Sequence, residues 1–234
     1  MSKIIVLVNK KRKVLSGKEL ADYIIAFLVL SFSFSIMMNG GFIFFGLLFT
    51  YTALTERLLY TFLTSLVFIS FPAVLTCFVF HETAHKVTAI RYGAKAYFKC
   101  FYWSIPITII SSLFMIIFAA PGGVVIQDWA GKPLNRKEQG ITAMNGPLTN
   151  MIIAGVMLPF VFMELNTVYA IYVFAIGYIN AFVGFFNTSI PYGPFDGAIV
   201  FRYNKKLWLV LFLVSFLLLI EYIILQPYCN PIII

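Results

Sequence analysis

The sequence predicts an all-α polytopic membrane protein with about five to seven transmembrane segments. The chain has 234 residues, of which 61% are hydrophobic and only 11% are charged, whereas a soluble domain carries about 25% charged residues. Long apolar runs alternate with short stretches rich in Lys and Arg. This composition leaves no room for a second large soluble domain, so we treat the chain as one membrane-embedded unit.

The charge balance indicates which partners to expect. The sequence holds 17 Lys and Arg against 9 Asp and Glu, a formal net charge of +8. In a membrane protein such a surplus marks cytoplasmic loops and contacts with anionic lipid headgroups. The basic residues flank apolar runs and do not cover one folded face. We therefore predict membrane lipid, and no nucleic acid, as a partner.

The N-terminal part of the chain divides into a tail and membrane segments. Residues 1–20 form a basic tail that the positive-inside bias places in the cytoplasm. Residues 21–57 hold the N-terminal membrane segments, beginning with a span at 23–38 that the sequence Asn-Gly-Gly at 39–41 ends. The apolar run at 42–53 is short for a crossing, so we predict that it does not cross.

A longer span at 58–80 follows, and its helix is expected to continue through His85 toward Arg91. Basic residues after it place this end on the cytoplasmic side; they are Lys86, Arg91, Lys95 and Lys99. The apolar run at 102–120 has positive charges on both sides, which favours a re-entrant hairpin and leaves a full crossing as the alternative. Residues 124–129 have the β-branched content of a short strand.

The second half contains three further apolar spans, at 141–163, 167–186 and 208–225. The last of these belongs to a C-terminal segment at 204–234. Between the second and third spans, residues 187–197 contain two prolines and two glycines. Irregular backbone at membrane depth is tolerated only where protein or a polar cavity surrounds it. This break is therefore a candidate site region.

The strongest motif is His81-Glu82-Thr83-Ala84-His85, which reads H-E-x-x-H. On a helix His81 and His85 lie one turn apart on one face, so both imidazoles can bind one zinc ion. Glu82 is placed to accept a proton from a water at the metal. The alternative is a chance match whose histidines bond to nearby carbonyls. Because buried ionisable groups are costly in lipid, we favour a functional site.

A catalytic zinc site usually has three protein ligands and one open position. The candidates for the third ligand are Asp128, Glu138, Glu164, Asp196 and Cys77. We favour Asp196, because it lies in the broken backbone at the cytoplasmic end of a span, beside Gly197, which permits close backbone approach. The alternative for Asp196 is an ordinary turn aspartate. The alternative for Cys77, one turn before His81, is a small buried thiol.

Three motifs together resemble the site-2 protease family of intramembrane zinc metalloproteases, peptidase family M50, in a compact form without PDZ or CBS domains. The first is the H-E-x-x-H of 81–85. The second is Gly-Pro-Leu-Thr-Asn at 146–150, which is similar to the family's G-P-x-x-N. The third is Pro-Tyr-Gly-Pro-Phe-Asp-Gly at 191–197, which is similar to the family's N-x-x-P-x-P-P-x-D-G. The resemblance covers about residues 58–203.

The resemblance implies a three-helix metalloprotease core within 58–203 and one zinc ion per chain. It implies the zinc ligands His81, His85 and Asp196, with Glu82 as general base. It also implies that Asn150 lies near the substrate strand or the reacting carbonyl, a hydrogen bond between helices being the alternative. Residues 102–129 would correspond to a membrane-embedded strand region that pairs with an unwound substrate.

The sequence departs from the family pattern near Asp196. The family's asparagine falls eight residues before the aspartate, at Thr188, whereas this chain has its asparagine at 187. Gly193 replaces a proline and Phe195 replaces a leucine. The Asp-Gly pair itself is intact, and the role of Asn187 stays open.

We therefore expect an intramembrane zinc endopeptidase that cuts a transmembrane segment of another membrane protein near the cytoplasmic side, as in regulated intramembrane proteolysis. Its N-terminus and its catalytic motif are expected to face the cytoplasm, and its oligomeric state is left open. One alternative is a non-catalytic relative that only binds membrane proteins, against which the intact Glu82 argues. A metal transporter is less favoured, because its acidic and histidine residues would be spread over several spans.

Overall fold

The computed structural model describes residues 15–43, 46–47, 55–117, 120–127, 133–165 and 169–229. Five helices in this part of the chain are long and apolar enough to cross a membrane, which confirms the predicted all-α polytopic class. They are α1 (Gly17–Met38), the continuous helix Thr55–Arg91, α7 (Arg136–Met163), α8 (Ala170–Ser189) and α10 (Lys205–Cys229).

The long helix from Thr55 to Arg91 confirms that the span predicted at 58–80 continues toward the H-E-x-x-H motif. Its parts are α3 (Thr55–Thr64), η2 (Ser65–Ser70), α4 (Phe71–Val74), η3 (Leu75–Phe80) and α5 (His81–Arg91). The segments η2 and η3 are π-helical and flank the short α4, which contains Pro72. Proline lacks the N–H of the regular helical ladder, so the ladder must change near it.

Helix α1 begins at Gly17 and not at 23, so its first turn falls within the predicted basic tail. Ser16 caps this helix, because its side chain accepts a hydrogen bond from the amide of Glu19 at 3.1 Å. A serine before a helix satisfies one of the free amides of the first turn. The early start places Glu19 on the helix and buries its side chain.

Helix α1 runs antiparallel to the long helix. At one end the side-chain amide of Asn39 donates to Oγ of Ser65 at 2.7 Å, and at the other end Lys86 pairs with Glu19 at 2.6 Å. The short run predicted at 42–53 lies mostly outside the described residues. The described helices on its two sides meet at the same end of the pair.

A small antiparallel sheet follows α5. Strand β1 (Lys95–Cys100) pairs with β2 (Gly122–Gln127), and the end pairs are Lys95 with Gln127 and Cys100 with Gly122. The strand predicted at 124–129 is thus present and starts earlier. Strand β1 was not predicted, although its residues alternate between exposed and buried as one face of a strand does.

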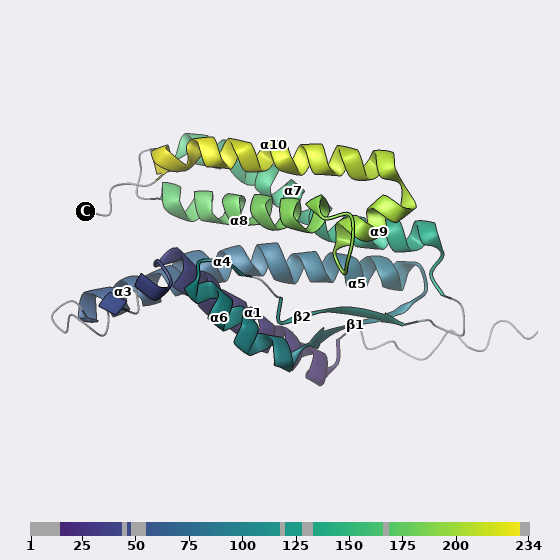
Figure 1. Ribbon diagram of the computed structural model, residues 1–234, viewed down its shortest axis with the longest axis horizontal. Helices are drawn as coiled ribbons and strands as arrows, with labels where there is room; N and C mark the ends of the chain where they lie inside the picture. Colours follow the sequence, from purple (N-terminus) through teal and green to yellow (C-terminus); the bar gives the residue numbers. More distant parts are fainter. Residues whose placement is uncertain are drawn as a thin grey trace, which may run out of the picture.

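The chain leaves the sheet at Phe101 and enters it again after Pro121. The amide of Phe101 donates to the carbonyl of Pro121 at 2.8 Å, directly beyond the last strand pair. Between them lie η4 (Tyr102–Ser104) and α6 (Ile105–Leu113), and α6 packs along α1 (Figure 1). The meeting of the two ends agrees with the predicted hairpin, and whether the segment crosses the membrane stays a prediction.

The second half forms a layer in which α7, α8 and α10 pack together, and α5 lies between this layer and the sheet (Figure 1). Helix α7 begins at Arg136 and not at 141, because a capping box joins Asn135 and Glu138. Helix α8 extends to Ser189. The chain is then non-helical until α9 (Asp196–Tyr203) begins, which confirms the predicted break.

Candidate metal centre

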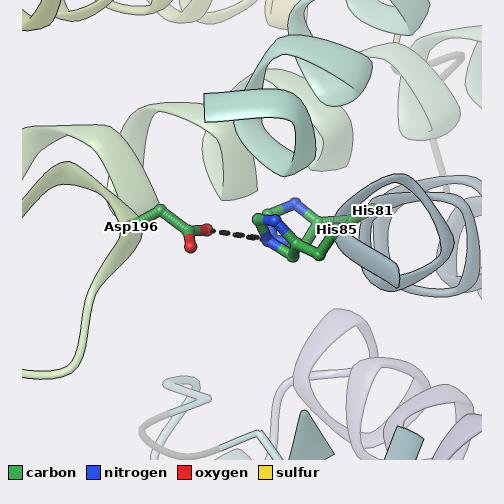
Figure 2. A group of neighbouring side chains, drawn as sticks. All are labelled: His81, His85 and Asp196. Carbon is green, nitrogen blue, oxygen red and sulfur yellow. Dashed lines mark hydrogen bonds and ion pairs between the residues drawn. The ribbon is translucent and has the colours of Figure 1, made fainter. Parts of the chain in front are cut away.

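The side chains of His81, His85 and Asp196, from two distant parts of the chain, point toward one another (Figure 2). Nε2 of His81 and Nε2 of His85 lie 3.0 Å apart, and each lies 3.2 Å from Oδ2 of Asp196. Tetrahedral ligands about 2.0–2.1 Å from a zinc ion are separated by about 3.3 Å. The donor set and its spacing therefore fit zinc.

The packing of α7 orients the imidazole of His85. Its Nδ1 lies 2.7 Å from the carbonyl oxygen of Thr142. A carbonyl can only accept, so Nδ1 carries the proton and Nε2 keeps its lone pair for a metal. Such an outer partner fixes the ring orientation of a ligating histidine. The sequence offers no signal for Thr142, because a backbone carbonyl serves at any residue type.

Asp196 is the first residue of α9, and the following Gly197 lets α9 approach the end of α8. A Cβ on Gly197 would lie 2.2 Å from the carbonyl oxygen of Thr188. Oδ2 of Asp196 lies 3.2 Å from Nε2 of each histidine, so this carboxylate is placed to act as the anionic ligand of a metal that both imidazoles also bind.

Helix α7 approaches the two histidines through Gly146. A Cβ at this position would lie 2.2 Å from Nε2 of His85 and 2.6 Å from Nε2 of His81. Only glycine leaves this space free. The sequence motif contains this glycine, but its direct contact with the ligand nitrogens was not predicted.

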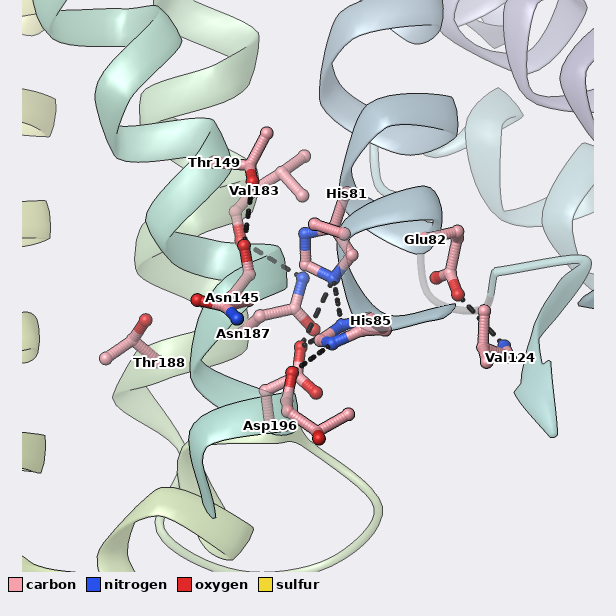
Figure 3. A network of polar contacts seen from close by, with 12 residues as sticks. His81, Glu82, His85, Val124, Asn145, Thr149, Val183, Asn187, Thr188 and Asp196 are labelled. Atoms are coloured by element: carbon pink, nitrogen blue, oxygen red, sulfur yellow. Dashed lines mark hydrogen bonds and ion pairs between the residues drawn. The ribbon is translucent and has the colours of Figure 1, made fainter. Parts of the chain in front are cut away.

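Glu82 lies beside the three converging residues without joining them. Its carboxylate is turned toward β2, where Oε2 accepts a hydrogen bond from the amide of Val124 at 2.9 Å (Figure 3). A cavity of about 810 Å³ is lined by Glu82, both histidines and Asp196, and β2 forms part of its wall. The four residues predicted as metal ligands and general base thus share one cavity.

None of the other described candidate ligands belongs to the cluster. Glu138 belongs to the capping box of α7 and Glu164 follows its last turn. Cys77 is buried in the cavity wall, but the described cluster with metal-ligand spacing consists of His81, His85 and Asp196. Asp128 lies outside the described residues.

The two asparagines of the predicted site occupy different environments. Asn150 is fully buried between α7 and α8, where a Cβ on Gly184 would lie 3.3 Å from its own Cβ. Within the described residues its amide has no hydrogen-bond partner, and it is not among those that line the cavity. The structure therefore shows no interhelical hydrogen bond from Asn150, and its substrate role stays a prediction.

Asn187 lines the cavity, and its amide donates to the carbonyl of Val183 at 3.1 Å. The neighbouring Thr188 is buried, and its hydroxyl donates to the carbonyl of Gly184 within α8. Figure 3 shows Asn187 on the side of the histidines and Thr188 away from them. The asparagine therefore reaches the cavity although it is displaced by one residue from the family pattern.

The fold and the converging side chains define a polytopic membrane protein with a site fit for zinc. Over 146 residues the chain is 37% identical to "Putative zinc metalloprotease MJ0611" of Methanocaldococcus jannaschii, an alignment that covers 61% of this chain and 73% of the relative. The chain therefore belongs to the zinc metalloprotease family of this relative. No family model matches the chain. No solved structure is significantly similar to it.

Proposed function

We propose that the protein is an intramembrane zinc endopeptidase of the site-2 protease family, which cuts a transmembrane segment of another membrane protein near the cytoplasmic side. The observation that carries this proposal is the convergence of two Nε2 atoms and one carboxylate oxygen, with Glu82 in the same cavity. The cavity lies among helices that are apolar enough to span a membrane. Its substrate would therefore be a segment that is itself in the membrane.

His81, His85 and Asp196 would hold the zinc ion. When bound, zinc supplies a Lewis acid that polarises a peptide carbonyl and makes a neighbouring water more acidic. Glu82 accepts the proton of the attacking water and later delivers it to the leaving amine nitrogen, which balances the hydrolysis. The carbonyl of Thr142 keeps His85 in the tautomer that this site requires.

The outer edge of β2 is the proposed docking edge for the substrate backbone. Phe98 and Val124 lie opposite each other in the sheet, and both amides point away from their partner strand. On the β1 side Glu19 accepts from the amide of Phe98, whereas on the β2 side the amide of Val124 faces the cavity. An extended peptide can add to such an edge through main-chain hydrogen bonds.

Docking and release of the base are then coupled. In this structure the carboxylate of Glu82 accepts the hydrogen bond that the amide of Val124 donates. A substrate carbonyl that pairs with this amide takes the place of Glu82, whose carboxylate is then free to receive a proton. An intact substrate helix hides its carbonyls, so the substrate must unwind locally before it can pair, and proline or glycine would ease that step.

The distribution of basic residues supports a cytoplasmic orientation of the site. Several helices have one end at the same side of the molecule as the site. Their ends are joined there by the contacts of Lys86 with Glu19 and of His85 with Thr142 and Asp196. The basic residues near that side are Lys18, Arg91, Lys95, Lys99, Arg136, Lys137, Arg202, Lys205 and Lys206. Among the described residues the opposite side has Arg57. The positive-inside bias favours placing the site end in the cytoplasm.

The test is cleavage by purified, zinc-loaded protein in detergent. The substrate is a membrane-spanning segment with a helix-breaking residue, and fragment masses locate the cut. We expect fragments cut near the cytoplasmic end, and no fragments after a chelator has removed the metal. A zinc-loaded wild type that leaves a panel of such substrates whole would contradict the proposal and favour the binding-only relative.

A further inference from the structure

We propose that Glu19, in the first turn of α1 and outside the predicted core at 58–203, is a positioning residue for the peptidase site. This inference rests on the proposed function. Glu19 would hold the strand pair that carries Val124 at a fixed place relative to α5. Two carboxylates accept hydrogen bonds from the outer amides of this strand pair, that of Glu19 from β1 and that of Glu82 from β2.

The carboxylate of Glu19 is buried and makes two short contacts. Oε1 accepts from Nζ of Lys86 at 2.6 Å and from the amide of Phe98 at 2.8 Å. The side chains of Glu19 and Lys86 are each only 6% exposed. Burying an ionised group is costly unless it is paired and hydrogen-bonded. One oxygen therefore joins α1, α5 and β1.

The hydrogen bond between Glu19 and Phe98 of β1 is linked to the general base Glu82 by the pairing of the two strands. Phe98 lies directly opposite Val124, whose amide donates to Glu82. The ring of Phe98 also stacks on Tyr23 of α1, with ring centroids 4.2 Å apart, and meets Phe78 edge-on at 5.6 Å. Helix α1 thus holds Phe98 by its backbone and by its ring, and the position of Val124 follows from that of Phe98.

The contact of Glu19 with α5 is the ion pair with Lys86, which is adjacent to a metal-ligand candidate. Lys86 follows His85 directly in the sequence, so the ion pair ties the H-E-x-x-H helix to the same carboxylate that holds the strand. The distance between the helix that carries Glu82 and the strand that carries Val124 is therefore set through Glu19. A change at Glu19 should alter substrate docking and base placement without removing a ligand.

The experiment compares two double variants that differ in one hydrogen-bond acceptor. In Glu19→Gln/Lys86→Met the side chain at 19 keeps an oxygen for the amide of Phe98. In Glu19→Met/Lys86→Met that oxygen is gone. Neither variant leaves an unpaired buried charge, and apolar replacement of a buried ion pair is often tolerated. The control is Asp22→Asn, because Asp22 is also a buried carboxylate of α1 but accepts from the hydroxyl of Tyr102.

The readouts are zinc content, amide hydrogen exchange of residues 95–100 and 122–127, and kcat and KM for the test substrate. We expect all variants to keep zinc. The strand amides should exchange about two- to tenfold faster in Glu19→Met/Lys86→Met (the Met variant) than in Glu19→Gln/Lys86→Met (the Gln variant). This factor corresponds to the loss of one neutral hydrogen bond. The kcat/KM of the Met variant should fall by a similar factor, and Asp22→Asn should match the wild type in both.

Equal strand exchange in the two double variants would overturn the proposal, whether or not the wild type cuts any substrate. The same acceleration in Asp22→Asn would also overturn it, because the effect would then be a general loosening of α1. Faster exchange in the Met variant alone supports the link from Glu19 to the strands even if the wild type shows no cleavage. That result would separate a failure of the proposed peptidase function from a failure of this inference.

Discussion

Gly146 of α7 faces Nε2 of His85 so closely that a Cβ at this glycine would lie 2.2 Å from the nitrogen. The methyl group of Gly146→Ala would therefore press on both imidazoles and on the space between them. We expect zinc affinity to fall about ten- to a hundredfold, the range for changes in the outer shell of a metal site. The measurement is a competition titration with a zinc indicator.

Gly155→Ala is the matched control for this prediction. Gly155 lies on the same helix, and a Cβ there would meet nothing within 4 Å. Both changes replace glycine with a better helix former, so any effect on the helix alone should be shared. Unchanged zinc affinity in Gly146→Ala would show that the ligands do not use this space.

Replacement of any one of the three ligand candidates should lower the zinc content of the protein. His81→Ala, His85→Ala and Asp196→Ala remove one donor from a set of three, so bound zinc per chain should drop in each case. Glu164→Ala serves as control, because this carboxylate lies after the last turn of α7 and away from the cluster. Metal analysis after gel filtration reads the result. Full zinc content in Asp196→Ala would rule out Asp196 as the third ligand.

The H-E-x-x-H spacing, the Asp-Gly pair in a broken apolar span and the resemblance to a known family together predicted the convergence of His81, His85 and Asp196. Helical periodicity fixes the relation of His81 to His85, and the break after α8 singles out Asp196. Apolar length also predicted a range of spans that includes the five candidate membrane-spanning helices of the described residues, and flanking charge favoured a hairpin at 102–120.

The contacts that orient the site were not predictable in the same way. The hydrogen bond from His85 to Thr142 joins residues 57 apart in sequence, and that from Phe98 to Glu19 joins residues 79 apart. Such contacts depend on how helices pack, which a local pattern does not determine. Strand β1 also escapes a local pattern, because its residues alternate in burial but not strictly in polarity.

We proposed that a substrate carbonyl replaces Glu82 as the acceptor of the Val124 amide, and two variants of Glu82 that lack the general base can test this. Glu82→Gln keeps an oxygen that can accept from the amide of Val124, whereas Glu82→Ala does not. An extended apolar peptide that pairs with β2 should therefore bind Glu82→Ala about two- to tenfold more tightly, the equivalent of one neutral hydrogen bond. Fluorescence polarisation of a labelled peptide with zinc-loaded protein measures this. Tighter binding to the Gln variant, or equal binding, would count against substrate pairing at this edge.

The orientation in the membrane is tested by labelling a cysteine at Arg91. This position is exposed and is the last residue of α5, and the native cysteines Cys77, Cys100 and Cys229 would first be replaced. We expect an impermeant thiol reagent to miss this cysteine in sealed right-side-out vesicles and to label it once the vesicles are opened. Strong labelling of intact vesicles would overturn the cytoplasmic placement.

The most direct test of the central claim is proteolysis by Glu82→Gln compared with the wild type. Gln keeps the size of the side chain and one acceptor, so the fold and zinc content should be unchanged, but it cannot accept and return a proton. The loss of a general acid–base catalyst is expected to lower the cleavage rate by about 10²–10⁴-fold. We expect the wild type to cut the test substrate, and Glu82→Gln to bind zinc equally and leave the substrate whole. Equal cleavage by the two zinc-loaded forms would contradict it.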